Sequence, residues 1–182
     1  MATDTFYVYA AAYDSVEAAE ADYTAVGQLH RDLGLMDFYD AAVLQKVSDG
    51  DDTRVKILHK HESAEWVDAG IGAAVGVGVG LLVAALPAVL LTGGLVVGSA
   101  AAGGAIGALT GHVTNGISRG DLKELGDVLG AGQAGVVVLA GVDAEKRMDQ
   151  AIASANQVVK KEIRLDRDEL DKELREIEKS IS

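Results

Sequence analysis

Alternating and periodic hydrophobic positions divide the first part of the chain into short predicted elements. Aromatic and small residues fill positions 6–13, and Asp14 and Ser15 then offer N-cap oxygens ahead of an acidic first turn. From Val16 the apolar positions recur every three or four residues until Gly34. This pattern predicts a strand followed by a helix. The helix would expose to solvent the side chains of Glu17, Glu20, Asp22, His30 and Arg31.

Two further apolar runs, residues 38–47 and 53–61, flank a turn-forming segment around Gly50 and predict a β-hairpin. Residues 120–129 are typical of a short helix, and residues 136–139 of a strand apolar enough to be buried on both faces. The order is therefore βαββ, an insertion, then αβ. It predicts an α+β fold, in which a four-stranded antiparallel sheet carries both helices on one face, the ferredoxin-like arrangement.

The remaining residues predict a C-terminal extension of a helix (143–155), a strand (157–165) and a final charged helix (166–182). The final helix carries a narrow apolar stripe made of Leu170, Leu174, Ile177 and Ile181. A stripe of this width packs either on the protein's own sheet or on a helix of a second subunit, so these residues are candidate oligomer contacts.

An uncharged stretch interrupts the predicted domain. The chain has 16 Lys and Arg and 28 Asp and Glu, and none of them lies between Asp68 and Arg119. A helix that crosses a bilayer needs about 20 apolar residues, so this stretch is long enough for two crossings. Residues 69–91 and 94–113 predict an antiparallel helical hairpin. The chain is thus divided into residues 1–66, the hairpin at 67–115, residues 116–142, and the extension at 143–182.

Glycines recur along the predicted hairpin at four-residue intervals, which makes a flat face on each helix. Small faces of this kind let two helices pack closely in lipid as a glycine zipper. The helix-packing residues predicted on this basis are Gly72, Gly76, Gly80, Gly94, Gly98, Gly103, Gly107 and Gly111. Trp66, just before the stretch, fits an interfacial anchor. In the alternative interpretation the same zippers pack between subunits of an oligomer, without lipid.

Charge and cysteine content exclude several classes of function. The formal net charge of −12 argues against binding to nucleic acid and against simple docking on anionic lipid headgroups, both of which rely on clustered Lys and Arg. Because the chain has no cysteine, it has no disulfide, no thiolate metal site and no thiol nucleophile.

Few residues suggest site chemistry. His59 and His61 lie two apart on a predicted strand, so both would project to one face and share a metal with Glu62, or simply face solvent. The acidic turn of Asp49, Asp51 and Asp52 would hold a hard cation loosely or be solvated. Neither pattern amounts to a metal, cofactor or catalytic site, and the sequence predicts none.

Four segments carry a resemblance to a known family: FYVYAAAYDSVEAAEADYTAV, LMDFYDAAVLQK, the run from GIGAAVGVGVG to GGAIGALTG, and ISRGDLKELGDVLGAGQAGVVVLAGVD. In order and composition the chain resembles the DUF1269 family, a group of small bacterial and archaeal proteins of unknown function that are predicted to be membrane proteins. The resemblance implies the same architecture and supplies no catalytic residues.

The leading hypothesis is a non-enzymatic, self-assembling protein. The hairpin would anchor it in or on a membrane, with the folded domain facing the cytoplasm and with the bilayer and further copies of the chain as partners. One alternative is a soluble homo-oligomeric shell or filament in the cytoplasm with the hairpin as its intersubunit core. Another is a sensor domain for a small ligand of unknown identity, by fold analogy.

Overall fold

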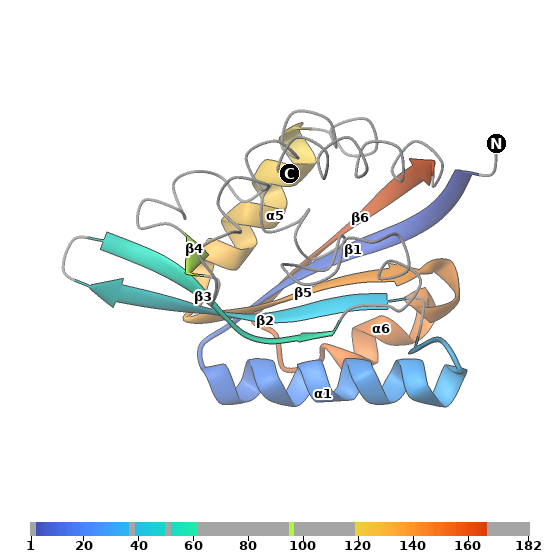
Figure 1. The fold of residues 1–182 in the computed structure, drawn as a ribbon, viewed down its shortest axis with the longest axis horizontal. Helices are drawn as coiled ribbons and strands as arrows, with labels where there is room; N and C mark the ends of the chain where they lie inside the picture. Colours follow the sequence, from blue (N-terminus) through green and yellow to red (C-terminus); the bar gives the residue numbers. More distant parts are fainter. Residues whose placement is uncertain (1–2, 37–38, 50–51, 62–94, 97–118, 167–182) are drawn as a thin grey trace, which may run out of the picture.

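The computed structural model describes residues 3–36, 39–49, 52–61, 95–96 and 119–166. They form a mixed α+β fold with one sheet in the order β4-β3-β2-β5-β1-β6 (Figure 1). The strands are β1 (Thr3–Tyr13), β2 (Tyr39–Asp49), β3 (Asp52–His61), β4 (Leu95–Val96), β5 (Ala134–Gly141) and β6 (Gln157–Asp166). The helices are α1 (Val16–Leu33), α5 (Arg119–Ala131) and α6 (Glu145–Ala151), which follows a 3-10 turn at Val142–Ala144. Within these ranges, no helix combines the length and the apolar character needed to cross a bilayer.

Local elements lie close to where the sequence predicts them. The Ser15 hydroxyl accepts a hydrogen bond of 3.2 Å from the backbone N–H of Ala18 and so caps the start of α1. The helix ends at Gly34, which adopts a left-handed conformation with φ 68°. The predicted β-hairpin is also confirmed, since Asp49 of β2 pairs with Asp52 of β3 across the turn. The helix predicted for residues 143–155 stops earlier, at Ala151.

Strand pairing connects segments that are far apart in the chain. β5 lies between β1 and β2 and is antiparallel to both, so that Val138 pairs with Tyr9 on one side and with Ala41 on the other. β6 pairs antiparallel along the other edge of β1, where Lys161 is opposite Val8. The predicted arrangement would have placed residues 53–61 between the first two strands. Instead β3 lies outside β2, and β6, predicted as part of an extension, is a full member of the sheet.

The two faces of the sheet have different chemistry. The aliphatic face, covered by α5, is built from Phe6, Val8, Ala10, Ala12, Ala42, Leu44, Leu125, Val128, Leu129, Val137 and Leu139. The tyrosine face, covered by α1 and α6, includes Tyr9, Tyr13, Val26, Tyr39, Val43, Val136, Val138, Met148 and Ile152, with Tyr7 and Tyr23 partly buried beside them. All five tyrosines of the chain therefore pack on one face.

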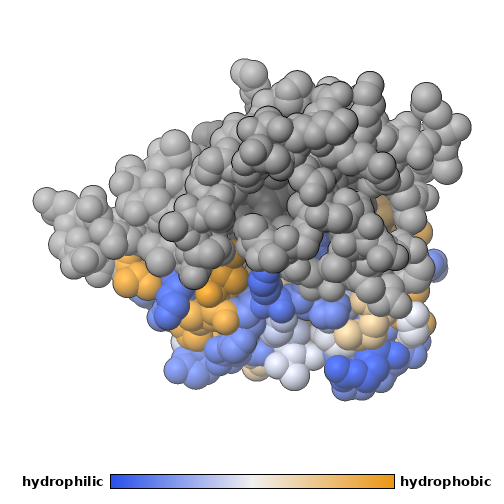
Figure 2. All heavy atoms as spheres, in the orientation of Figure 1, coloured by the Kyte–Doolittle hydropathy of each residue, from blue (hydrophilic) through white to orange (hydrophobic). Residues whose placement is uncertain are grey.

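The position of α5 corrects the predicted layering. The sequence pattern placed residues 16–33 and 120–129 on one face, but α1 and α5 lie on opposite faces (Figure 1). The reason lies in β5, which is buried along Ala134–Ala140. A strand that is apolar on both sides needs helices on both sides to remove it from water. In Figure 2 the outward side of α1 is largely hydrophilic, as expected for a covering helix.

Of the predicted helical hairpin at 67–115, the structure describes only Leu95 and Val96. Leu95 and Val96, predicted inside its second helix, instead form the short strand β4, parallel to Val55 and Lys56 of β3. The other predicted packing and contact residues lie outside the described residues. They are Trp66, Gly72, Gly76, Gly80, Gly94, Gly98, Gly103, Gly107, Gly111, Leu170, Leu174, Ile177 and Ile181.

Candidate functional site

Three aromatic rings stack where α1 crosses the β2–β3 hairpin. The His30 ring lies 3.9 Å from the Tyr39 ring, measured between centroids, at an interplanar angle of 15°. Tyr39 lies 4.2 Å from His61 on its other side, at 16°. The helix contributes one ring, β2 the middle ring and β3 the last, so the stack joins three elements in a single contact. We refer to His30, Tyr39 and His61 as the ring stack.

His30 is fully buried, which corrects its predicted place on the solvent-exposed side of the helix. Its Nδ1 lies 2.8 Å from the carbonyl oxygen of Val26. A carbonyl oxygen only accepts, so Nδ1 carries the proton in this contact. Nε2 is buried and has no hydrogen-bond partner among the described residues. Burial lowers the pKa of His30, and His61 acts in the same direction, against the opposing effect of the Val26 carbonyl.

Tyr39 is 4 % exposed and is held between the two imidazoles. Burial, with Asp40 and Tyr23 acting in the same direction, raises its pKa to about 12. Gly27 of α1 lets the phenol come close, since a Cβ at this position would lie 3.3 Å from the Tyr39 hydroxyl oxygen. The His61 Nε2–H donates to the carbonyl oxygen of Met36 at 3.1 Å, which attaches the last ring to the segment between α1 and β2.

A second polar group is enclosed on the tyrosine face. Asp22, predicted to face water, is 5 % exposed. Its Oδ2 accepts hydrogen bonds from the Tyr13 hydroxyl at 3.1 Å and from the backbone N–H of Ser154 at 2.9 Å. The carboxylate thus links α1, β1 and the segment that follows α6. Burial, and then the nearby carboxylate, raise the pKa of Tyr13 well above its ordinary value.

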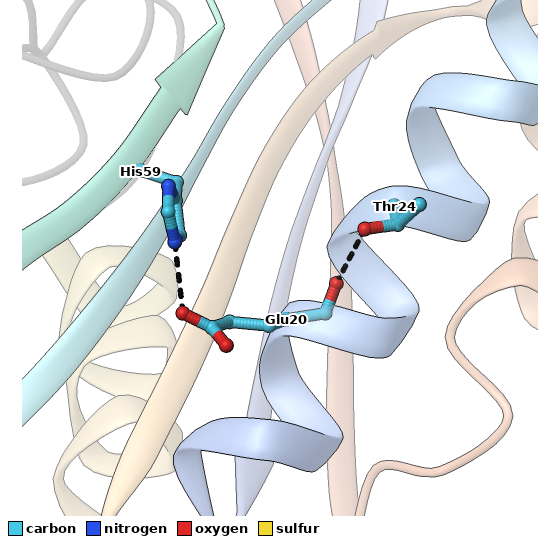
Figure 3. Close-up of polar contacts among 3 residues, drawn as sticks. All are labelled: Glu20, Thr24 and His59. Atoms are coloured by element: carbon cyan, nitrogen blue, oxygen red, sulfur yellow. Dashed lines mark hydrogen bonds and ion pairs between the residues drawn. The ribbon is translucent and has the colours of Figure 1, made fainter.

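His59 makes an exposed polar contact on the same face. Its Nε2 lies 2.8 Å from Glu20 Oε1, and Thr24, one turn further along α1, donates its hydroxyl to the Glu20 carbonyl (Figure 3). The Tyr23 ring stacks on His59 at 6.0 Å. His59 and His61 do share a face of β3, as their spacing predicts, but they contact different partners. The described residues contain no group of three His, Cys, Asp or Glu side chains positioned for a metal ion, and Glu62 lies outside them.

Lysines hold α5 on the aliphatic face. Lys161 of β6 contacts Asp121 Oδ1 at 3.0 Å and Glu124 Oε2 at 2.6 Å, both in the first half of the helix. Lys46 of β2 donates to the carbonyl oxygen of Gly130, near the helix end. A lysine at a helix C-terminus satisfies a carbonyl that has no partner within the helix. These contacts position α5 and leave the buried titratable groups of the tyrosine face as the main candidate for function.

A signal for the buried polar residues was present in the sequence. The buried positions of α1 are Ala19, Asp22, Val26 and His30, which recur at intervals of three and four residues. This spacing marks one helix face as clearly as the apolar stripe used for the prediction. Residue type alone placed Asp22 and His30 outside the core, because charged and polar side chains are usually exposed.

Comparison of the chain with protein-family models, with curated proteins and with solved structures gives no significant match. The resemblance to the DUF1269 family therefore stays a prediction, and the ring stack and the enclosed carboxylate are described from this chain alone.

Proposed function

We propose that the protein is a non-enzymatic, self-assembling anchor. A sheet domain facing the cytoplasm would hold both ends of a glycine-zipper hairpin, which assembles with other copies in or on a membrane. The observation that carries the proposal is the interleaving of the sheet. β5, which follows the uncharged stretch, lies between β1 and β2, which precede it.

This pairing constrains the insertion. β1, β2 and β5 form one sheet, so both ends of the insertion must return to the same folded domain. An insertion that enters a bilayer and returns to the same side crosses it an even number of times, and the uncharged stretch is long enough for two crossings. Every charged residue lies outside this stretch, as expected if the stretch lies in apolar surroundings and the rest of the chain in water.

The strand order also supports a finer description of the domain, which we include in the proposal. β2-β5-β1-β6, with α1 and α6 on one face, has the order and layering of a ferredoxin-like sheet. On this description β3, β4 and α5 are additions between its second and third strands. The sequence-based prediction assigned other segments to the third strand, the second helix and the fourth strand. On the present description these elements are β5, α6 and β6. The insertion would then connect β3 with α5, which are both added elements, and would leave the pairing of β5 with β1 and β2 intact.

Membrane fractionation of the full chain tests the anchoring. We expect the protein in the membrane pellet after an alkaline carbonate wash, and in uniform oligomers once it is extracted with detergent. A detergent-free, uniform large particle in the soluble fraction would contradict anchoring and support the shell or filament alternative. A monomer in the soluble fraction would contradict both.

A pair of matched variants tests the zipper. In Gly76→Leu/Gly107→Leu, large side chains would separate the helices and lower the oligomer order. The control Gly76→Ala/Gly107→Ala keeps the faces small and should assemble more nearly like the parent chain. Normal assembly of the leucine variant, with the same particle size by light scattering, would refute the zipper.

A further inference from the structure

The ring stack joins the buried imidazole of His30 to β3, the strand that leads into the insertion. His61 is the last residue of β3, and the long apolar segment follows it in the chain. The stack is formed by α1, β2 and β3, and its middle ring lies about one ring thickness from each imidazole, at 3.9 Å and 4.2 Å. A change that separates these rings removes one contact between β3 and α1 and leaves that of His59 with Glu20.

We propose that the ring stack is an acid-sensitive latch, which holds the C-terminal half of α1 on the β2–β3 hairpin at neutral pH and releases it when His30 binds a second proton. This inference does not depend on membrane anchoring or on self-assembly. It rests on the position of one atom, the buried Nε2 of His30.

A second proton on His30 has no acceptor in the closed arrangement. Nδ1 already donates to the Val26 carbonyl, so the added proton goes to Nε2, which is buried without a hydrogen-bond partner among the described residues. Burying an unpaired, charged donor is strongly unfavourable. The imidazolium would gain a cation–π contact with Tyr39, but this gain is smaller than the cost of burying the charge without a partner. The protonated state is therefore favoured only when the latch opens and Nε2 reaches water.

The charges around the stack act on the latch from three elements. His61 on β3 opposes protonation of His30, and Arg31 on α1 and Asp40 on β2 act on the Tyr39 ring, together with Tyr23. Because burial lowers the pKa of His30 below its ordinary 6.5, the closed form binds fewer protons than the open form. Closed-state stability is then complete above this ordinary value and declines as the pH falls through it. The open population rises by at most about tenfold for each pH unit in that window.

Hydrogen exchange of the full chain, normalised to intrinsic exchange rates, tests the latch. Between about pH 7 and about pH 5.5 we expect protection to fall by about tenfold in the His30 end of α1 and in β2–β3, but not in β1 and β5. His30→Phe keeps a stacking ring without a titratable group, and His30→Gln keeps a donor for the Val26 carbonyl. Whichever of them folds should lose the pH dependence.

The control is His59→Gln, which removes the exposed histidine of the same strand and should retain the wild-type response. Three outcomes would overturn the proposal. These are protection that does not change with pH in the wild-type chain, a fall that persists in the His30 variants, and an equal fall throughout β1 and β5, which would indicate global unfolding.

Discussion

The two faces of one sheet contrast in how they use buried side chains. The aliphatic face buries mainly apolar groups under α5, with the fully buried Asp40 of β2 as an exception opposite Leu139. Its ionic contacts between Lys161 and the carboxylates of Asp121 and Glu124 lie at its margin. The tyrosine face buries phenols, an imidazole and a carboxylate under α1 and α6. Apolar burial is independent of pH, whereas buried titratable groups make stability depend on pH. Most of the buried titratable groups of the described residues therefore lie on the tyrosine face, and we expect this layer to respond to pH more strongly than the other.

The buried phenols of the tyrosine face predict the largest change in folding stability, at alkaline pH. Burial raises the pKa values of Tyr9, Tyr13 and Tyr39, so the folded domain keeps protons that the unfolded chain loses above about pH 10. Stability falls as the pH rises from that point, by up to about 1.4 kcal/mol for each unit that separates a folded from an unfolded pKa. Urea unfolding against pH should show a steep decline. Tyr39→Phe should decline less steeply, and an unchanged slope in this variant would contradict the assignment.

A cavity on the aliphatic face should cost stability at every pH. Leu125→Ala removes a side chain that is 4 % exposed, so we expect a loss of about 2–5 kcal/mol in the free energy of unfolding. The curve of stability against pH should shift downward without a change of shape. Leu125→Met conserves volume and serves as the control, with a loss below about 1.5 kcal/mol. If Leu125→Ala also changed the slope with pH, the separation of the two faces would be refuted.

Removal of the enclosed carboxylate should have a smaller effect on the tyrosine face. Asp22→Ala leaves the Tyr13 hydroxyl and the Ser154 N–H without their acceptor, which costs about 1–3 kcal/mol at neutral pH. Asp22→Asn keeps one acceptor oxygen in place and should lose less. Urea unfolding of both variants measures the difference, and equal losses would show that the carboxylate acts through its charge alone.

Two phenols on the same face of β1, separated there by Ala11, give the smallest and sharpest test. The Tyr13 hydroxyl donates to Asp22, whereas the buried Tyr9 hydroxyl has no hydrogen-bond partner among the described residues. Tyr13→Phe should lower the free energy of unfolding by about 0.5–1.5 kcal/mol. Tyr9→Phe should be neutral or stabilising, because it removes a buried polar group that lacks a partner. The reverse order in thermal unfolding would contradict the hydrogen-bond assignment.

Much of the secondary structure could be predicted from short-range patterns. α1 follows from the Ser15 cap, the apolar repeat and Gly34, and the hairpin follows from the turn between Asp49 and Asp52. Both depend on residues close together in the chain, where periodicity and turn preference decide the conformation. The ring stack could not be found in this way, because His30, Tyr39 and His61 lie on three different elements.

By itself, the sequence determined the kinds and approximate limits of the described helices and strands other than β4, and the separation of all charged residues from one long apolar stretch. The tertiary structure decided that β5 lies between β1 and β2, that α5 covers the opposite face from α1, and that Asp22 and His30 are buried. Local preferences act within a few residues, whereas strand order and burial depend on which distant surfaces remove the most apolar area from water together.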